Sequence, residues 1–226
     1  MIQQHQAQIY KSDFREISIT GTGKRFITIN DSDNQCDSNY IYLLNEEILL
    51  PKCSAVTTVE SSFDVIILPL FGGVEYKDSL GNENFIRVEQ VSHIEAKKGM
   101  SFELYNPYGQ NVSYLQIWLN AKAQHSKNKC KSFGFDLSQK NQLIPLFETS
   151  YALGFIGIYD GRKEDLYTLK EASNGVFVFV IHGAFEVENR LLEARDGLRI
   201  EQIEMIEWEA LSENALLMVL EIPSDK

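Results

Sequence analysis

Residues 74–82 read Val-Glu-Tyr-Lys-Asp-Ser-Leu-Gly-Asn, and this stretch decides the fold. Its second half, Asp78 to Asn82, is a turn signal, because Asp and Asn bond their own backbone and Gly accepts a positive φ. An apolar run, Val65 to Leu70, precedes the turn, and a shorter run, Phe85 to Val88, follows it. Short apolar runs on both sides of such a turn predict strands joined by a chain reversal.

The same pattern recurs along the chain, where Gly, Asn or Asp interrupts period-2 alternation about every ten residues. Sustained helical periodicity is rare. Glu201 to Glu209 could form a helix face, but the turn at Asp196-Gly197 and the alternation around Trp208 favour a strand with one wet face. We therefore predict an all-β protein of sandwiches or barrels. The expected strands are residues 40–44, 47–50, 54–59, 65–70, 85–88, 93–96, 101–105, 113–119, 154–159, 165–169, 175–181, 184–187, 190–193, 205–210 and 215–222.

The strand pattern occurs twice, which predicts two domains in tandem. Each half contains a Gly-containing turn in mid-course, Gly72-Gly73 in the first half and His182-Gly183 in the second. A polar, lysine-containing stretch with almost no apolar pattern separates the halves. We expect a first domain at residues 1–120, a linker at 121–142 and a second domain at 143–226.

Composition excludes several classes of protein. The chain has 226 residues, 44% of them hydrophobic, and a formal net charge of −11, so its field repels nucleic-acid phosphates. No apolar run is long enough to span a bilayer, and the polar N-terminus does not resemble a signal peptide. The three cysteines are isolated in the sequence, which favours neither a disulfide framework nor a zinc cluster. We expect a cytoplasmic protein that binds neither nucleic acid nor membranes.

Residues 74–82 resemble the V-E-H-x-D-S-x-G-N turn of pirins and of the related bacterial quercetin 2,3-dioxygenases. Ala96 to Met100, Tyr105 to Pro107 and Leu115 to Trp118 follow in that family's order and spacing. The second half is similar more loosely, through residues 175–188, 196–198 and 216–223. The resemblance implies two cupin domains, which are RmlC-like jelly-roll β-barrels, in tandem.

The resemblance also implies where a metal site would lie. In that family the first cupin binds a divalent metal, usually iron, through an H-x-H pair and a later H-x-E pair. Counting from the shared motifs, the first pair falls on Thr58 and Glu60, and the second on Phe102 and Leu104. Thr, Phe and Leu are poor or impossible ligands for a divalent metal. The resemblance therefore implies that this chain holds neither the family's metal nor another cofactor.

Two residues near these positions have alternative interpretations. His93 lies beside Glu95 and could act as a surrogate ligand, or it could be a packed strand histidine. Glu60 could be a carboxylate left in an emptied pocket, or it could face solvent, because a slip of one residue in strand register exchanges the two faces. The other histidines, His5, His125 and His182, do not share ligand spacing with His93 or with one another.

Two classes of function remain open from the sequence. The first is a non-catalytic module that binds a small apolar or aromatic ligand, or a protein partner, with a candidate pocket made of Thr58, Glu60, Phe102, Leu104 and His93. The second is an enzyme, either a quercetinase-like dioxygenase with displaced metal ligands or a metal-free cupin acting through carboxylates. Phosphate-cradling glycine loops and nucleophile-elbow motifs are absent from the sequence.

Overall fold

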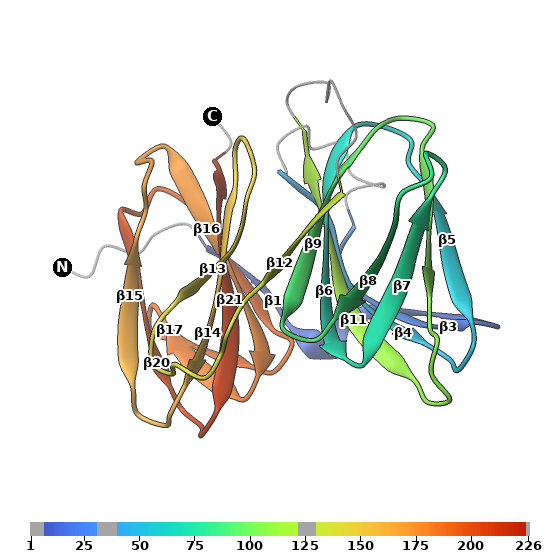
Figure 1. Ribbon diagram of the computed structural model, residues 1–226. Helices are drawn as coiled ribbons and strands as arrows, with labels where there is room; N and C mark the ends of the chain where they lie inside the picture. Colours follow the sequence, from blue (N-terminus) through green and yellow to red (C-terminus); the bar gives the residue numbers. More distant parts are fainter. Residues whose placement is uncertain (1–6, 31–39, 122–129, 225–226) are drawn as a thin grey trace. The chain divides into compact units, whose positions relative to one another are not determined.

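The computed structural model describes residues 7–30, 40–121 and 130–224, and their regular structure is almost entirely β-strand (Figure 1). The strands pair antiparallel, and the exception to strand is a 3-10 turn at Ser12–Phe14. Within the described ranges, no helix is long and apolar enough to cross a membrane. The predicted all-β class is confirmed.

The chain divides into two compact units, and the described residues 16–30, 40–121 and 130–134 form the first barrel. Its larger sheet contains, in spatial order, β12 (Cys130–Gly134), β9 (Gln90–Ala96), β6 (Phe63–Phe71), β11 (Val112–Asn120), β4 (Ile41–Leu49), β3 (Gly23–Asn30) and β2 (Glu16–Thr20). Its smaller sheet contains β5 (Ser54–Thr58), β10 (Ser101–Tyr105), β7 (Gly73–Asp78) and β8 (Glu83–Arg87).

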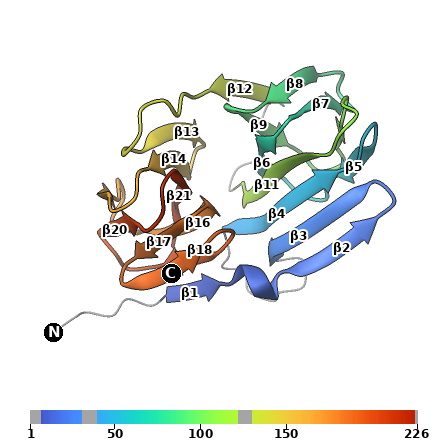
Figure 2. The same ribbon diagram turned by 90° about the horizontal axis from the view of Figure 1, so that it is seen from below.

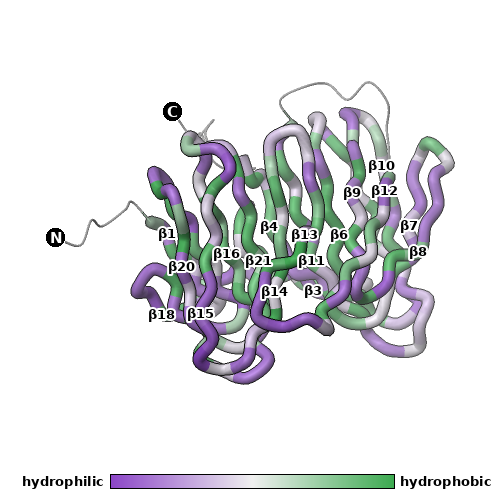
Figure 3. Tube along the Cα trace, turned by 60° about the vertical axis from the view of Figure 1, so that its left-hand side comes forward, coloured by the Kyte–Doolittle hydropathy of each residue, from purple (hydrophilic) through white to green (hydrophobic). Residues whose placement is uncertain are grey.

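The core of the first barrel lies between these two sheets. Val65 and Trp118 from the larger sheet belong to the same buried cluster as Tyr76, Phe102 and Leu104 from the smaller one. Successive side chains of a strand point to opposite faces, so this cluster identifies which residues face inward. Figure 3 shows the consequence, with apolar residues concentrated in the strands and hydrophilic residues in many of the connecting turns.

The second barrel is built in the same way from the described residues 7–15 and 135–224. Its larger sheet contains β1 (Ala7–Tyr10), β19 (Gly197–Ile200), β16 (Asn174–His182), β21 (Ala215–Pro223), β14 (Leu153–Tyr159) and β13 (Ile144–Glu148). Its smaller sheet contains β15 (Glu164–Thr168), β20 (Met205–Ala210), β17 (Ala184–Val187) and β18 (Arg190–Glu193). Strand β20 confirms that the acidic stretch around Trp208 is not a helix.

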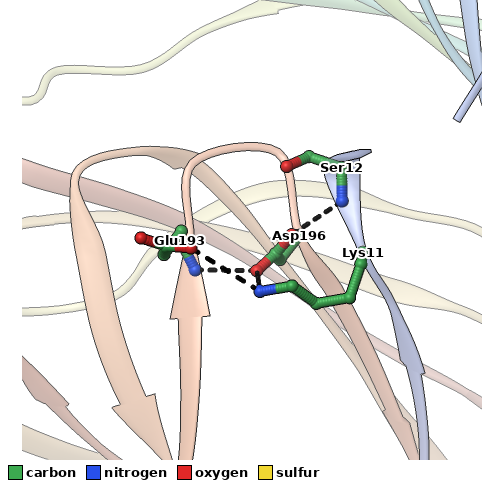
Figure 4. A network of polar contacts seen from close by, with 4 residues as sticks. All are labelled: Lys11, Ser12, Glu193 and Asp196. Atoms are coloured by element: carbon green, nitrogen blue, oxygen red, sulfur yellow. Dashed lines mark hydrogen bonds and ion pairs between the residues drawn. The ribbon is translucent and has the colours of Figure 1, made fainter. Parts of the chain in front are cut away.

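The N-terminal strand β1 belongs to the second barrel, where it pairs with β19. The carboxylate of Asp196, which is completely buried, accepts hydrogen bonds from Lys11 Nζ at 2.5 Å and from the Ser12 amide at 2.7 Å (Figure 4). It also accepts one from the Glu193 amide at 2.9 Å. Asp196 therefore joins the start of the chain to a turn far along the sequence.

The units divide the chain at points other than those expected from composition. The described residues before Glu16 group with the second half, because of the β1 pairing. The expected linker at 121–142 contains strand β12, in which Cys130 pairs with Ile94 of β9. That strand escaped prediction because it is an exposed edge strand without apolar alternation. The expected strands at 40–44 and 47–50 are one strand, β4.

Candidate functional site

The turn after β7 is organised by one carboxylate. Asp78 accepts hydrogen bonds from the amides of Leu80 and Asn82, both at 2.9 Å, and from Tyr76 Oη at 2.8 Å. Burial alone would raise the pKa of Asp78, but these bonds and one from the Asn82 side chain outweigh it and hold the pKa below its ordinary value. Gly81 takes a φ of +87°, which favours glycine. The sequence motif at 74–82 is therefore structural in this chain.

Phe102 and Leu104 lie in the core of the first barrel and are 2% and 1% exposed. Their direct partners on β5 are Thr57 and Ala55. Residues directly opposite one another in an antiparallel pair share a face, so Thr57 points inward and Thr58 points outward. The next inward position is Val59, which is 1% exposed and bonds the Met100 carbonyl at 2.8 Å.

The other expected site residues also lie apart from Phe102 and Leu104. Glu60 follows the end of β5 and is exposed. His93 neighbours the inward-facing Ile94, so its side chain points to the opposite face of the sheet. There its Nε2 lies 2.6 Å from the Asp64 carboxylate, and both residues are buried. His182 is exposed at the end of β16, while His5 and His125 lie outside the described residues.

A pocket of about 310 Å³ opens beside these residues in the first barrel. It brings together Thr58 and Glu60 but not Phe102, Leu104 or His93. Aromatic rings form part of its lining, with ring centroids 4.5 Å apart for Tyr42 and Phe63 and 5.0 Å apart for Phe63 and Trp118. The lining residues are Arg25, Ile27, Asn30, Tyr42, Leu43, Asn45, Thr57, Thr58, Glu60, Phe63, Gln116 and Trp118.

Three lining residues on neighbouring strands lie side by side, and two of them, Asn45 and Gln116, are polar. Asn45 on β4 lies directly opposite Ile27 on β3 and Gln116 on β11, and Trp118 follows on the same face of β11. Asn45 is 1% exposed and Trp118 is 5% exposed. Within the described part of the chain, neither Asn45 Oδ1 nor Trp118 Nε1 has a hydrogen-bond partner. Two residues of the pocket lining therefore each bury a polar atom, one acceptor and one donor, that lacks a partner among the described residues.

The charge at this end of the barrel is internally balanced. Arg25 Nε lies 2.5 Å from the Glu47 carboxylate, and Glu47 is 5% exposed. Burial raises the pKa of Glu47 above its ordinary value, and Arg25 and Asn45 oppose that shift only in part. Tyr114 lies directly opposite Glu47, and burial together with that negative charge raises the pKa of its phenol. Glu47 itself does not line the pocket.

Both the sequence and the fold of this chain are similar to those of known proteins. The family described as the quercetinase C-terminal cupin domain matches residues 155–222. The solved structure of bacterial pirin YhhW from Escherichia coli in complex with nickel(II) is 16% identical, with a TM-score of 0.83, and the match covers 97% of this chain and 100% of that one. The chain therefore has the two-barrel bicupin fold of these structures.

Other structures agree with this assignment. Quercetin 2,3-dioxygenase from Acinetobacter baumannii is 15% identical, with a TM-score of 0.77, over 96% of this bicupin and 79% of that chain. YhaK from Escherichia coli is 19% identical, with a TM-score of 0.74, over 94% of this chain and 95% of that one. No curated protein sequence matches the chain. At these identities the likeness establishes the fold.

Neither barrel of this bicupin groups metal ligands in its described residues. Across residues 7–30, 40–121 and 130–224, no set of three or more His, Cys, Asp or Glu side chains is placed to hold a metal ion. The second barrel has a wider hollow of about 510 Å³, whose lining includes exposed carboxylates. Glu209 of β20 lies between Glu164 of β15 and Glu186 of β17 there. Glu209 thus belongs to the solvent-facing side that was expected for the acidic strand.

Sequence reasoning missed the residues that shape the first-barrel pocket. Arg25, Asn45, Gln116 and Trp118 come from three strands and meet only through the pairing of β3, β4 and β11. One signal was present in the sequence. Asn45, Glu46 and Glu47 interrupt an apolar stretch, and the period of two places Asn45 and Glu47 on one face of the strand.

Proposed function

We propose that the first cupin of this bicupin is a binding module for a small, uncharged aromatic molecule, and that it acts without a metal. The observation that carries the proposal is that Asn45 and Trp118, which line a pocket with aromatic rings, bury two polar atoms without a partner among the described residues, Asn45 Oδ1 and Trp118 Nε1. A buried polar atom without a partner costs about 1–3 kcal/mol. A ligand that pairs both atoms recovers that cost, and its ring can stack on Tyr42, Phe63 or Trp118.

The residues at the inherited metal position do not fit a divalent metal. The inward positions on β5 are Thr57 and Val59, and those on β10 are Phe102 and Leu104. The Phe102 ring already packs against Tyr76 and Trp118, with centroids 6.0 and 6.2 Å away. This apolar packing supports a filled core where the family has imidazole and carboxylate ligands.

The charges around the pocket support an uncharged ligand. Arg25 is paired with Glu47, and Glu60 adds an unpaired negative charge to the exposed part of the lining. An anion would meet the Glu60 carboxylate, and Arg25, the cation among the described lining residues, is already paired with Glu47. Glu60 is also the carboxylate among the described lining residues, and its exposure gives no support to an acid-base enzyme.

The test is a calorimetric titration of the chain with benzamide and, separately, with benzoate. The two molecules share a ring and a shape, but benzamide is neutral with a donor and an acceptor, whereas benzoate is an anion. We expect saturable benzamide binding in the millimolar range, because a fragment this small reaches only modest affinity. Benzoate should bind at least about tenfold more weakly. Equal binding of the two, or no binding of either, would contradict the proposal.

A second arm separates binding from oxygen chemistry. Quercetin is supplied with the chain and with excess ferrous iron, and oxygen consumption is followed with and without a chelator. We expect no consumption above the protein-free control, because the inward positions lack metal ligands. Chelator-sensitive consumption would support a dioxygenase with displaced ligands instead.

A further inference from the structure

Arg25 is the cation among the described residues that line the first-barrel pocket, and it comes from β3, which lies between β2 and β4 (Figure 2). Its Nε donates to the Glu47 carboxylate of β4 at 2.5 Å. Within the described part of the chain, its two Nη groups make no hydrogen bond. The Arg25 side chain is 41% exposed and that of Glu47 is 7% exposed. The pocket thus holds a cation whose charge is balanced by a buried carboxylate outside the lining.

Glu47 has neighbours that favour each of its two charge states. Arg25 on β3 and Tyr114 on β11 lie directly opposite it on either side. Arg25 favours the carboxylate, whereas burial favours the protonated form and outweighs Arg25, so the pKa of Glu47 is raised. Glu16 on β2 and Glu60 beyond β5 add exposed carboxylates on the same side of the sheet. The buried Tyr114 Oη has no hydrogen-bond partner among the described residues, so it can accept a hydrogen bond from a protonated Glu47.

Protonation of Glu47 leaves the charge of Arg25 uncompensated. A guanidinium group binds a carboxylate or sulfonate with two parallel hydrogen bonds, and the two Nη groups of Arg25 can supply them. Aromatic rings lie in the same lining, so an aromatic anion can pair with Arg25 while its ring stacks. When Glu47 is ionised, its pair with Arg25 is neutral and the Glu60 carboxylate repels an anion. The charge state of Glu47 therefore changes which ligands the pocket favours.

We propose that Glu47 sets the charge of the ligand that this pocket binds. An ionised Glu47 restricts the pocket to neutral aromatic molecules, and a protonated Glu47 allows an aromatic sulfonate or carboxylate to bind at Arg25. This inference rests on the proposed function of the same pocket and adds its regulation by pH. Glu47 does not line the pocket, so it acts through Arg25 as a residue that determines specificity.

Calorimetric titrations at pH 7 with benzenesulfonate, which is an anion across the pH range of proteins, and with benzamide test this role. We expect E47Q to bind benzenesulfonate at least about tenfold more tightly than the unmodified chain, while its benzamide affinity changes less than about threefold. R25Q/E47Q should lose the gain. E46Q is the matched control, because Glu46 is the next residue of β4, is 8% exposed and faces the other side of the sheet. Its benzenesulfonate affinity should change less than about threefold.

A pH series on the unmodified chain does not depend on whether E47Q folds. The affinity for benzenesulfonate should rise as pH falls through the folded-state pKa of Glu47, and R25Q should abolish this rise. Above that pKa, binding of the anion should take up about one proton, which titrations in buffers of different ionisation enthalpy measure. The affinity for benzamide should stay constant over the same series.

The outcomes separate this inference from the proposed function. Benzamide binding without a gain for benzenesulfonate, either in E47Q or at lower pH, would overturn the role of Glu47 and leave the proposed function intact. An equal gain in E46Q would assign the effect to net charge and would also overturn that role. Failure of benzamide to bind any of these proteins would overturn the proposed function, and with it this inference.

Discussion

Thr57 on β5 lies directly opposite Phe102 on β10. This pairing fixes which side chains of β5 enter the first barrel, and it makes Thr57 and Val59 the inward pair in place of Thr58 and Glu60. Thr58 and Glu60, the positions counted from the shared motifs, each lie one residue away from an inward-facing position. A shift of that size moves every side chain of a strand to the other face of the sheet.

We expect that a metal site can be built only at the inward positions. We predict that T57H/V59H/F102H/L104E binds one nickel ion per chain, because three imidazoles and a carboxylate then converge on one face. The matched variant T58H/E60H/F102H/L104E should bind nickel much more weakly. Replacing Phe102 and Leu104 costs about 2–5 kcal/mol each as lost core packing, so the melting temperature with and without nickel is the measurement. A larger nickel-dependent rise in the second variant would refute the assigned register.

Asn45 should matter for binding more than for stability. We expect N45L to lose benzamide binding while its free energy of unfolding stays within about 1 kcal/mol of the unmodified chain, because removing an unpaired buried oxygen offsets the lost contact with Glu47. N84L is the control, since Asn84 donates to Ser132 in the same barrel but does not line the pocket. Denaturant unfolding and calorimetry measure the two effects. Unchanged benzamide affinity in N45L would remove Asn45 from the site.

Glu47 should make stability depend on pH. Burial raises its folded-state pKa above the ordinary value, so the protonated form favours folding, and that contribution fades as pH rises through the folded-state pKa. E47Q cannot ionise. The free energy of unfolding of E47Q, relative to the unmodified chain, should therefore be more favourable at pH 7 than at pH 4. The opposite trend would mean that Arg25 stabilises the carboxylate more than burial penalises it.

Asp196 should hold the N-terminal strand to the second barrel. We expect D196A to lose about 3 kcal/mol of stability, because Lys11 and two amides lose their buried acceptor. K11M leaves the hydrogen bonds from the two amides in place and should lose about 1 kcal/mol.

The stabilisation by Asp196 should also depend on pH. Burial acts to raise the pKa of Asp196, but its hydrogen bonds and Lys11 outweigh burial and lower that pKa. The stabilisation is therefore present above the ordinary pKa of aspartate and is lost as pH falls through the lowered pKa. Hydrogen exchange of the β1 amides measures whether β1 detaches from β19, and unchanged protection of these amides in D196A would argue that Asp196 does not hold β1 in place.

The fold could be predicted from the sequence where local signals were strong. Asp78 and Gly81 mark a turn through their own chemistry, and the alternation around Trp208 identifies β20. Strand β12 could not be predicted in this way, because an exposed edge strand needs no apolar face. Strand β1 was missed because its pairing with β19 joins residues about 190 positions apart.

The site was harder to predict than the fold, because it depends on register. Asn45, Gln116 and Ile27 form a row only when three strands are aligned, and irregularities interrupt the register after Ile27 and after Trp118. One residue of slip at either place would separate the row. The residue types can be read from the sequence, but the register of the paired strands determines which of these residues lie side by side.

The central claim is that the first barrel binds an uncharged aromatic molecule beside Trp118 without a metal. The most direct measurement is the fluorescence of Trp118 in W208F, in which it is the remaining tryptophan of the chain, during titration with benzamide in the presence of a chelator. The account predicts a saturable change that the chelator leaves intact and that benzoate does not reproduce. An absent change, or one that appears only when a divalent metal is added, would contradict it.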